Sequence, residues 1–155
     1  MYYKLLGLNK EPFSTSPDPE FFYYSQGHRT ALKRLEIQIR LRRGMSLICG
    51  DVGTGKTTLS RILLKQFAQE QDFLFYMLLD PLVDSQQQCI AHLVRTVGLK
   101  ADLSSSFACR SAIEEILLRK GVKENKTVVL LIDEAQKITD SNLEFLRTLL
   151  NFETN

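Results

Sequence analysis

Three short runs of apolar residues stand out along the chain, at residues 45–49, 73–80 and 127–133. Each run has the length of a β-strand and is too short for a buried helix. Unbroken apolar runs of this length are typical of parallel strands that are covered on both faces. They alternate with segments in which apolar residues recur every three or four positions, the spacing of an amphipathic helix. This alternation predicts an α/β domain with a parallel sheet sandwiched between helices.

The segments between the predicted strands carry signals for helix ends. Ser25 is placed to cap the first helix and Gly44 to end it, and Gly98 follows the third helix. Ser141 and Glu144 form a capping box at the start of the last helix. The expected helices cover residues 28–43, 59–71, 84–97, a segment that follows serines 104–106 and ends near residue 121, and the segment from 140 onward.

An arm of residues 1–26 is predicted to precede a single domain of residues 27–155. The arm is rich in tyrosine and phenylalanine and has prolines at positions 12, 17 and 19. Proline lacks the backbone N–H that a helix interior needs, so a continuous helix is not expected there. The aromatic content is too high for a disordered tail. We therefore expect an ordered, irregular arm that lies on the core.

Residues 50–57 read Gly-Asp-Val-Gly-Thr-Gly-Lys-Thr and satisfy the phosphate-loop pattern GxxxxGK[ST] in full. The glycines let the backbone approach an anion closely, and successive N–H groups then form a nest for phosphates. The helix that follows adds the positive end of its dipole. Lys56 brings a full charge to the β- and γ-phosphates, and the Thr57 hydroxyl can reach Mg²⁺. The residues expected to bind the nucleotide here are Gly50, Asp51, Val52, Gly53, Thr54, Gly55, Lys56, Thr57 and Thr58.

The third apolar run ends in two acids, Asp133 and Glu134. At the carboxyl end of its strand, Asp133 would lie beside the phosphate loop and hold Mg²⁺ through water. Glu134 points another way and is placed to polarise a water for attack on the γ-phosphate. The alternative is that Asp133 caps a turn and Glu134 is merely solvated. Asp80 ends the second run and is a weaker candidate, because Asp80-Pro81 reads more simply as a turn.

Charge and cysteine content add few constraints. The net charge of +2 indicates no particular partner. The three cysteines, at positions 49, 89 and 109, have neither paired spacing nor a histidine cluster, so we expect reduced thiols buried as small apolar side chains in the cytoplasm. Neither a signal peptide nor a membrane-spanning run is evident, so a soluble chain is expected.

With these motifs identified, the whole chain resembles the AAA+ ATPases that form the A component of the general secretion pathway (the ExeA/GspA type). The resemblance is carried by the opening YKLLGLNKEPFSTSPDPEFFYYSQGH, by GDVGTGKTTL, by IDEAQKIT and by LEFLRTLLNFET. The first and last of these segments are more discriminating than the phosphate loop, which many ATPases share.

The resemblance implies Mg²⁺-dependent binding and hydrolysis of ATP by a homo-oligomer. It further implies a role at the cytoplasmic face of the inner membrane, in assembly of a secretion or pilus complex with envelope partners. It also places Tyr24 and His28 near the adenine pocket, although these aromatic side chains could instead only cover the core.

The family's additional-strand fold, as the resemblance implies, orders its sheet as strands five, one, four, three, two. The three apolar runs would be strands one, two and three. Strand four, the sensor residue, the arginine finger and the helical lid are not found in residues 1–155, so the module looks truncated. Two expectations follow. Residues 45–49 should not pair with residues 128–132, and the isolated chain should hydrolyse ATP poorly because the arginine comes from a neighbouring subunit.

Two alternatives to an envelope ATPase remain open at this stage. The first is a DNA-associated ATPase of the transposition type, since basic residues cluster on and after the first helix and could contact phosphates. The cluster comprises Lys33, Arg34, Arg40, Arg42 and Arg43. The second is a nucleotide-gated scaffold without catalysis, although a protein that only binds nucleotide does not need Glu134.

Overall fold

The computed structural model describes residues 2–11, 22–81 and 85–150. A short helix, α1 (Tyr2–Leu5), precedes the domain. The domain then runs through α2 (Gln26–Arg40), α3 (Lys56–Phe67), β1 (Phe73–Leu78), α4 (Gln86–Thr96), α5 (Ser106–Leu117), a π-helical turn η2 (Leu118–Lys123), β2 (Thr127–Ile132), a 3-10 turn η3 (Ala135–Lys137) and α6 (Asp140–Leu149).

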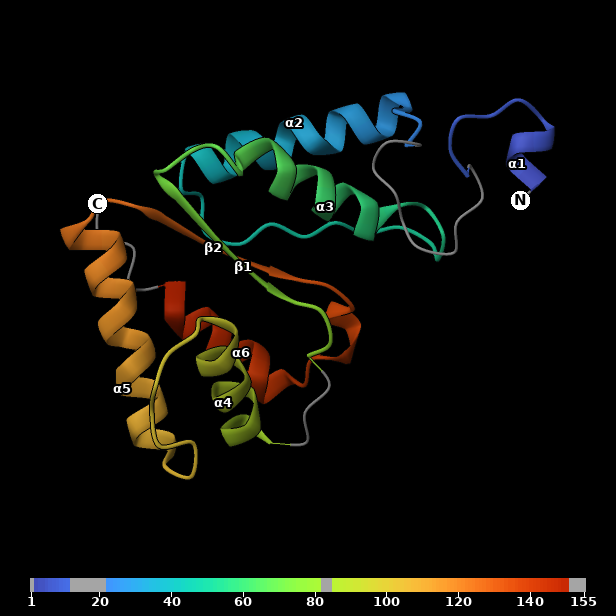
Figure 1. Cartoon of the computed structure of the whole chain (residues 1–155). Coiled ribbons are helices and arrows are strands. Elements are labelled where there is room, and N and C mark those ends of the chain that lie inside the picture. Colours follow the sequence, from blue (N-terminus) through green and yellow to red (C-terminus); the bar gives the residue numbers. More distant parts are fainter. Residues whose placement is uncertain (1, 12–21, 82–84, 151–155) are drawn as a thin grey trace.

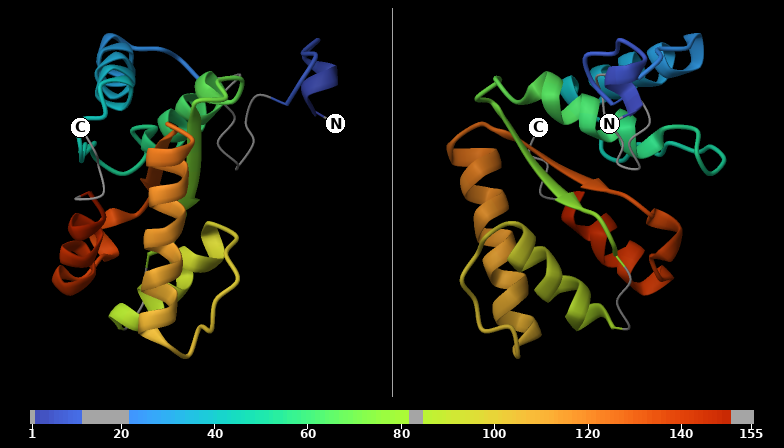
Figure 2. Two further views of the ribbon diagram at one scale, coloured as in Figure 1. Left: turned by 90° about the vertical axis from the view of Figure 1, so that its left-hand side faces the viewer. Right: turned by 45° about the vertical axis from the view of Figure 1, so that its right-hand side comes forward.

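Two of the three predicted strands form a parallel pair in the described residues. β1 and β2 pair in register from Phe73 opposite Thr127 to Leu78 opposite Ile132. Helices α2 and α3 lie on one side of this pair, and α4, α5 and α6 lie on the other (Figures 1 and 2). The predicted parallel sheet between two layers of helices is therefore confirmed.

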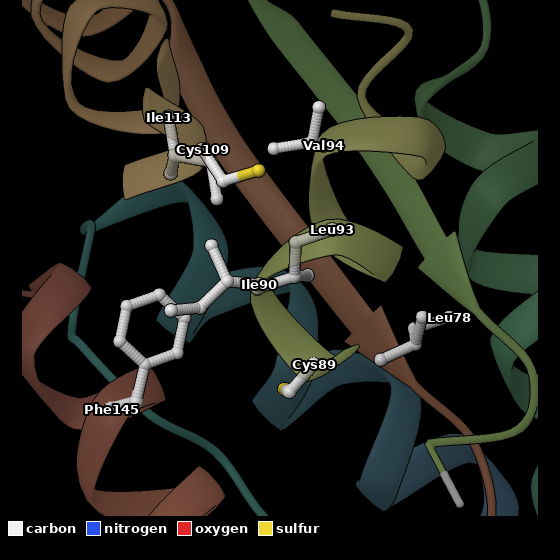
Figure 3. Packing of buried hydrophobic residues seen from close by; sticks show 8 residues of the cluster. All are labelled: Leu78, Cys89, Ile90, Leu93, Val94, Cys109, Ile113 and Phe145. Carbon is white, nitrogen blue, oxygen red and sulfur yellow. The ribbon is translucent and has the colours of Figure 1, made fainter. Parts of the chain in front are cut away.

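Each face of the strand pair covers its own apolar cluster, which explains the unbroken apolar runs of β1 and β2. The larger cluster joins β1 to α4, α5 and α6 (Figure 3), and consists of Leu78, Cys89, Ile90, Leu93, Val94, Cys109, Ile113 and Phe145. The second cluster joins α2 and α3, and consists of Leu32, Leu59, Ile62, Leu63 and Phe67. Phe73 and Phe75 of β1 pack against the second cluster, where their rings contact Phe67.

The prediction of a buried strand at residues 45–49 is wrong for this structure. The segment carries no strand arrow (Figure 1) and has no ladder partner in the described residues. Met45, Leu47 and Cys49 are exposed. An apolar run becomes a buried strand only when another strand satisfies its backbone groups and helices cover its faces. The accompanying expectation that this segment does not pair with residues 128–132 is confirmed, because β2 pairs with β1 alone among the described strands.

Most predicted helix ends agree with the structure within a few residues. Ser25 caps α2 by accepting the N–H of His28, and Ser105 caps α5 in the same way through Ala108. The capping box of Ser141 and Glu144 is wrong. Thr139, whose backbone is extended, accepts the N–H of Asn142 instead, so Ser141 already lies within the first turn of α6.

Helix α2 is attached to the turn after α3 by a forked ion pair. The Arg40 guanidinium donates to both carboxylate oxygens of Glu70, at 2.9 and 2.8 Å. These hydrogen bonds lower the pKa of Glu70 below its ordinary value, and the partnership with Glu70 and Glu36 raises the pKa of Arg40. Arg40 also lies over the Phe67 ring, so its apolar stem extends the second cluster.

The cysteines depart in part from the expectation of burial. Cys89 and Cys109 are buried in the larger cluster, and burial raises the pKa of the Cys89 thiol. Cys49 is exposed because it belongs to the unpaired segment 45–49. In the part of the chain that the structure describes, no helix combines the length and apolar character needed to cross a bilayer.

The predicted arm of residues 1–26 is described only at its two ends. Its first end forms α1, and Leu5 and Leu6 near it are exposed rather than packed on the core. Its second end brings Phe22 against the second apolar cluster. The prolines at positions 12, 17 and 19 lie outside the described residues.

Candidate functional site

The loop of residues 50–57 connects residues 45–49 to α3, as the motif requires. Gly53 and Gly55 have φ angles of 79° and 87°, in a region that side chains rarely adopt. Gly55 is the N-cap of α3, so the helix begins at Lys56 and its free N–H groups face the loop. The glycines of the motif are thus needed for backbone shape, and the loop surrounds the positive end of a helix dipole.

Lys56 lies across this loop and its charge is directed inward. Its ammonium donates to the carbonyl oxygens of Gly50 and Asp51, both at 2.8 Å. The Thr54 hydroxyl donates to the same Asp51 carbonyl at 2.8 Å and braces the loop from within. An ammonium held between carbonyls at the mouth of an amide nest is placed to meet a phosphate anion.

The two motifs meet through a single short hydrogen bond. Thr57 at the start of α3 donates its hydroxyl hydrogen to Asp133 Oδ2 at 2.7 Å, across 76 positions of sequence. The backbone N–H of Asp133 donates to the Leu78 carbonyl at 2.9 Å, which extends the β1–β2 ladder and fixes where the carboxylate lies. The structure therefore brings together the two residues predicted to hold a metal ion.

The donor set fits a magnesium ion. A hydroxyl has one hydrogen and two lone pairs, so Thr57 can keep its hydrogen bond to Asp133 and still offer oxygen to a cation. Mg²⁺ is usually held by one or two protein oxygens together with waters and substrate phosphates, rather than by a dedicated cage. The described residues contain no group of three or more His, Cys, Asp or Glu side chains that could hold a metal ion.

Glu134 is held in an unusual backbone conformation beside Asp133. Its φ angle is 54°, in the left-handed region that costs a residue other than glycine about 1–3 kcal/mol. Its carboxylate is exposed and accepts a hydrogen bond of 2.6 Å from the Gln136 amide. The contact with Gln136 restrains the Glu134 side chain. The sequence carried no signal that would have identified Gln136.

An open groove with a volume of about 1900 Å³ contains these groups. The phosphate loop with Lys56 and Thr57 lines the groove, and so does β2 with Asp133 and Glu134. Apolar residues of α6 also line it, including Leu143 and Leu146. The loop residues Asp51 and Val52 are exposed and also line the groove, as does Thr58 of α3.

The end of the arm packs against the phosphate loop. His28 Nε2 lies 2.9 Å from the Thr54 carbonyl oxygen. The Phe22 ring lies between Tyr24 and His28, with ring centroids 5.1 and 4.7 Å away, respectively. Tyr24 and His28 were expected near the adenine pocket, whereas Phe22 was not singled out. The aromatic run at residues 21–24 was the only signal that could have indicated it.

The basic cluster considered for DNA binding is partly engaged within the protein. Arg40 pairs with Glu36 and Glu70, and Arg42 donates to Asn125 and to the Thr127 hydroxyl. These two guanidinium groups therefore hold α2 and the following turn against the rest of the domain. Lys33, Arg34 and Arg43 are exposed on the surface.

Comparisons with known proteins agree with the site. A family model described as an AAA domain matches residues 39–155. The chain is also 34% identical, over all 155 residues, to General secretion pathway protein A of Aeromonas hydrophila, and spans 28% of the length of that relative. No solved structure matches the chain significantly. The resemblance seen in the motifs is thereby confirmed.

Proposed function

Because this chain belongs to the AAA family of P-loop ATPases, we propose that it binds ATP with Mg²⁺ in the groove between residues 50–58 and Asp133, and hydrolyses it there. The observation that carries this proposal is the 2.7 Å hydrogen bond between Thr57 and Asp133. A phosphate loop without a ligand has no need of a carboxylate at the hydroxyl of its last threonine. A magnesium nucleotide needs both oxygens in one place.

Each residue of the site has a distinct role in this proposal. The amides of residues 50–58 bind the phosphates, and the Lys56 ammonium moves from the carbonyls of the loop to the β- and γ-phosphates. Thr57 and Asp133 would hold Mg²⁺ in this proposal. When bound, the ion neutralises charge that develops on the phosphate oxygens.

Glu134 is the proposed general base. Its carboxylate accepts a proton from a water aligned with the γ-phosphorus. The water oxygen bonds to that phosphorus as the bond to the β–γ bridging oxygen breaks, so ADP and phosphate are the products. The Gln136 amide competes for the same carboxylate, so that contact must loosen for Glu134 to meet the water. Tyr24 and His28 are proposed to lie at the nucleoside end of the site, beside the loop.

We further propose a biological role in the general secretion pathway, by analogy with the Aeromonas relative. In this role the chain works as part of a homo-oligomer at the cytoplasmic face of the inner membrane and powers assembly of an envelope complex. A neighbouring subunit supplies the arginine that completes the site, which makes turnover by the isolated chain slow.

The second candidate is a DNA-associated ATPase of the transposition type. The exposed side chains of Lys33, Arg34 and Arg43 support it, because they could contact DNA phosphates. Binding to duplex DNA that weakens steeply with salt, and that weakens again when these three residues are replaced by alanine, would favour it. Equal binding by the triple variant would favour the secretion role.

Titration of the purified protein with ATP tests the site itself. We expect affinity that depends on Mg²⁺ and is lost in excess chelator. Lys56→Ala should lower ATP affinity about 30- to 150-fold, since it removes charge-assisted hydrogen bonds to the phosphates. Lys65→Ala is the matched control, because Lys65 is an exposed lysine in the last turn of the same helix. Absence of magnesium-dependent affinity for ATP or GTP, with no effect of Lys56→Ala, would overturn the proposal.

A further inference from the structure

We propose that His28 is a positioning residue for the phosphate loop. Through its hydrogen bond to the Thr54 carbonyl, it holds the peptide between Thr54 and Gly55 so that the Gly55 amide faces the bound phosphates. The inference rests on the nucleotide site proposed above and adds to it a residue of helix α2. His28 lies beside the loop at the nucleoside end of the proposed site, and the effect inferred for it is on the loop amide that meets the phosphates and not on the base.

Both ring nitrogens of His28 have partners. The Thr54 carbonyl can only accept, so the Nε2 atom 2.9 Å away carries a hydrogen. Nδ1 lies 3.0 Å from the Ser25 hydroxyl and 3.2 Å from the Tyr23 carbonyl oxygen. The Ser25 hydroxyl also accepts the backbone N–H of His28. Ser25, the cap of α2, and Tyr23 therefore orient the ring from its Nδ1 side.

Because the peptide bond is planar, the position of the Thr54 carbonyl also determines the direction of the Gly55 N–H. In a trans peptide the C=O and the following N–H point to opposite sides. The described residues contain no cis peptide, so fixing the Thr54 carbonyl toward His28 turns the Gly55 N–H away from His28. That N–H belongs to the nest at the start of α3, which is the group expected to meet phosphate.

The loop needs an external restraint at this point. The peptide between Thr54 and Gly55 turns through ψ of Thr54 and φ of Gly55. Glycine adopts positive and negative φ angles with similar ease, so Gly55 lowers the steric cost of that rotation. The backbone N–H of Thr54 makes only a long bond of 3.4 Å to the Asp51 carbonyl, so the bond from His28 is the shorter restraint on the backbone here.

Phe22 supports the same contact from the other side. A Cβ built on Gly55 would lie 2.9 Å from Phe22 Cε2 and 3.8 Å from His28 Nε2. The Phe22 ring therefore rests directly on the backbone at Gly55, and it also packs against the His28 ring. Ring and imidazole together form one surface against which the loop is held.

Binding of two ligands that share phosphates but differ in the base tests the inference. The probes are Mg·ATP and Mg·tripolyphosphate, titrated into the full chain and into His28→Ala, His28→Asn and His28→Gln. The glutamine amide reaches about as far as Nε2, whereas the asparagine amide reaches only as far as Nδ1. His92→Gln is the control, because His92 is the other histidine of the chain and lies in α4.

We expect His28→Ala and His28→Asn to weaken both ligands by about the same factor, roughly 3- to 10-fold, as for one lost hydrogen bond. His28→Gln should stay within about twofold of the parent chain, as should His92→Gln. Thermal unfolding of each variant shows whether the domain remains folded. The Asn and Gln pair keeps the test valid if His28→Ala fails to fold.

Two outcomes overturn the inference without touching the proposed function. One is a loss in His28→Asn that is confined to ATP and spares tripolyphosphate, which would assign His28 to the base. The other is a loss in His28→Gln as large as in His28→Asn, which would show that the hydrogen bond is not the cause. Failure of the proposed function looks different, because the parent chain itself would then bind neither ligand.

Discussion

The two edges of β2 have very different neighbours. On one edge, all six residues of β2 pair with β1. Leu78, the last residue of β1, is only 2% exposed. The other edge borders the groove, which residues 45–49 also line, and Leu47 is 77% exposed. Both neighbours are apolar runs of similar composition, so the difference does not come from side-chain chemistry. It comes from whether a ladder and a covering layer of helices are present.

The comparison separates stability from chemistry. The paired edge holds the larger apolar cluster together, and the open edge gathers the phosphate loop, Lys56, Thr57, Asp133 and Glu134 around one groove. Groups that must bind an anion and a cation need access to solvent and ligand, which a closed core would deny. Substitutions on the two edges should therefore affect different measurements.

The largest expected effect is on turnover at the open edge. Glu134→Gln should lower single-turnover ATP hydrolysis about 10²- to 10⁴-fold because it removes the proton acceptor, with ATP affinity within about twofold. Glu144→Gln on α6, where the acid is engaged by Arg147, is the matched control. Undiminished hydrolysis by Glu134→Gln would remove the assignment of the base.

The same substitution on each side of β2 gives the sharpest contrast in stability. Leu78→Ala should lower the free energy of unfolding by about 2–5 kcal/mol because it leaves a cavity in the core. Leu47→Ala should change it by no more than about 0.5 kcal/mol. Urea unfolding of the two variants measures both values. Equal losses would mean that the two edges are alike in solution and that segment 45–49 is buried.

Amide exchange in a longer chain would show whether the open edge can close. The comparison uses a longer protein in which residue 155 is followed by the segment that comes after the matched region in the relative. In it we expect amide exchange at residues 45–49 to slow at least about tenfold, because an inserted strand would pair with residues 45–49. The amides of β1 should be protected with or without the added segment. Unchanged exchange at 45–49 would contradict the strand order implied by the family resemblance.

The smallest effect concerns the ion pair between Arg40 and Glu70, away from both edges. Arg40 lowers the pKa of Glu70 from its ordinary value of 4.5, so the pair stabilises the fold above that pH, and this contribution is lost as the pH falls through the lowered value. The urea midpoint of the parent chain should exceed that of Glu70→Gln at pH 7, and the gap should shrink below about pH 4.5. A gap that does not depend on pH would contradict the linkage.

Much of the site could be anticipated because its parts are local. The spacing of Gly50, Gly53, Gly55 and Lys56 needs only a turn and a helix start, and both are set by neighbouring residues. The approach of Asp133 to the phosphate loop, where Thr57 lies, followed from placing Asp133 at the carboxyl end of its strand. The contacts of Phe22 and Gln136 were not anticipated, because they depend on how the arm folds back and on a strained turn at Glu134.

The amino-acid sequence by itself determined the helices, the strands β1 and β2, the phosphate loop and the acids that follow β2, since each depends on periodicity, capping or glycine spacing within a short window. Only the tertiary structure decided whether an apolar run is buried. Residues 45–49 have the composition of an inner strand and lie exposed. A strand is stabilised by hydrogen bonds and apolar contacts with segments that are distant in the sequence. A pattern of five residues cannot predict whether those segments pack against it.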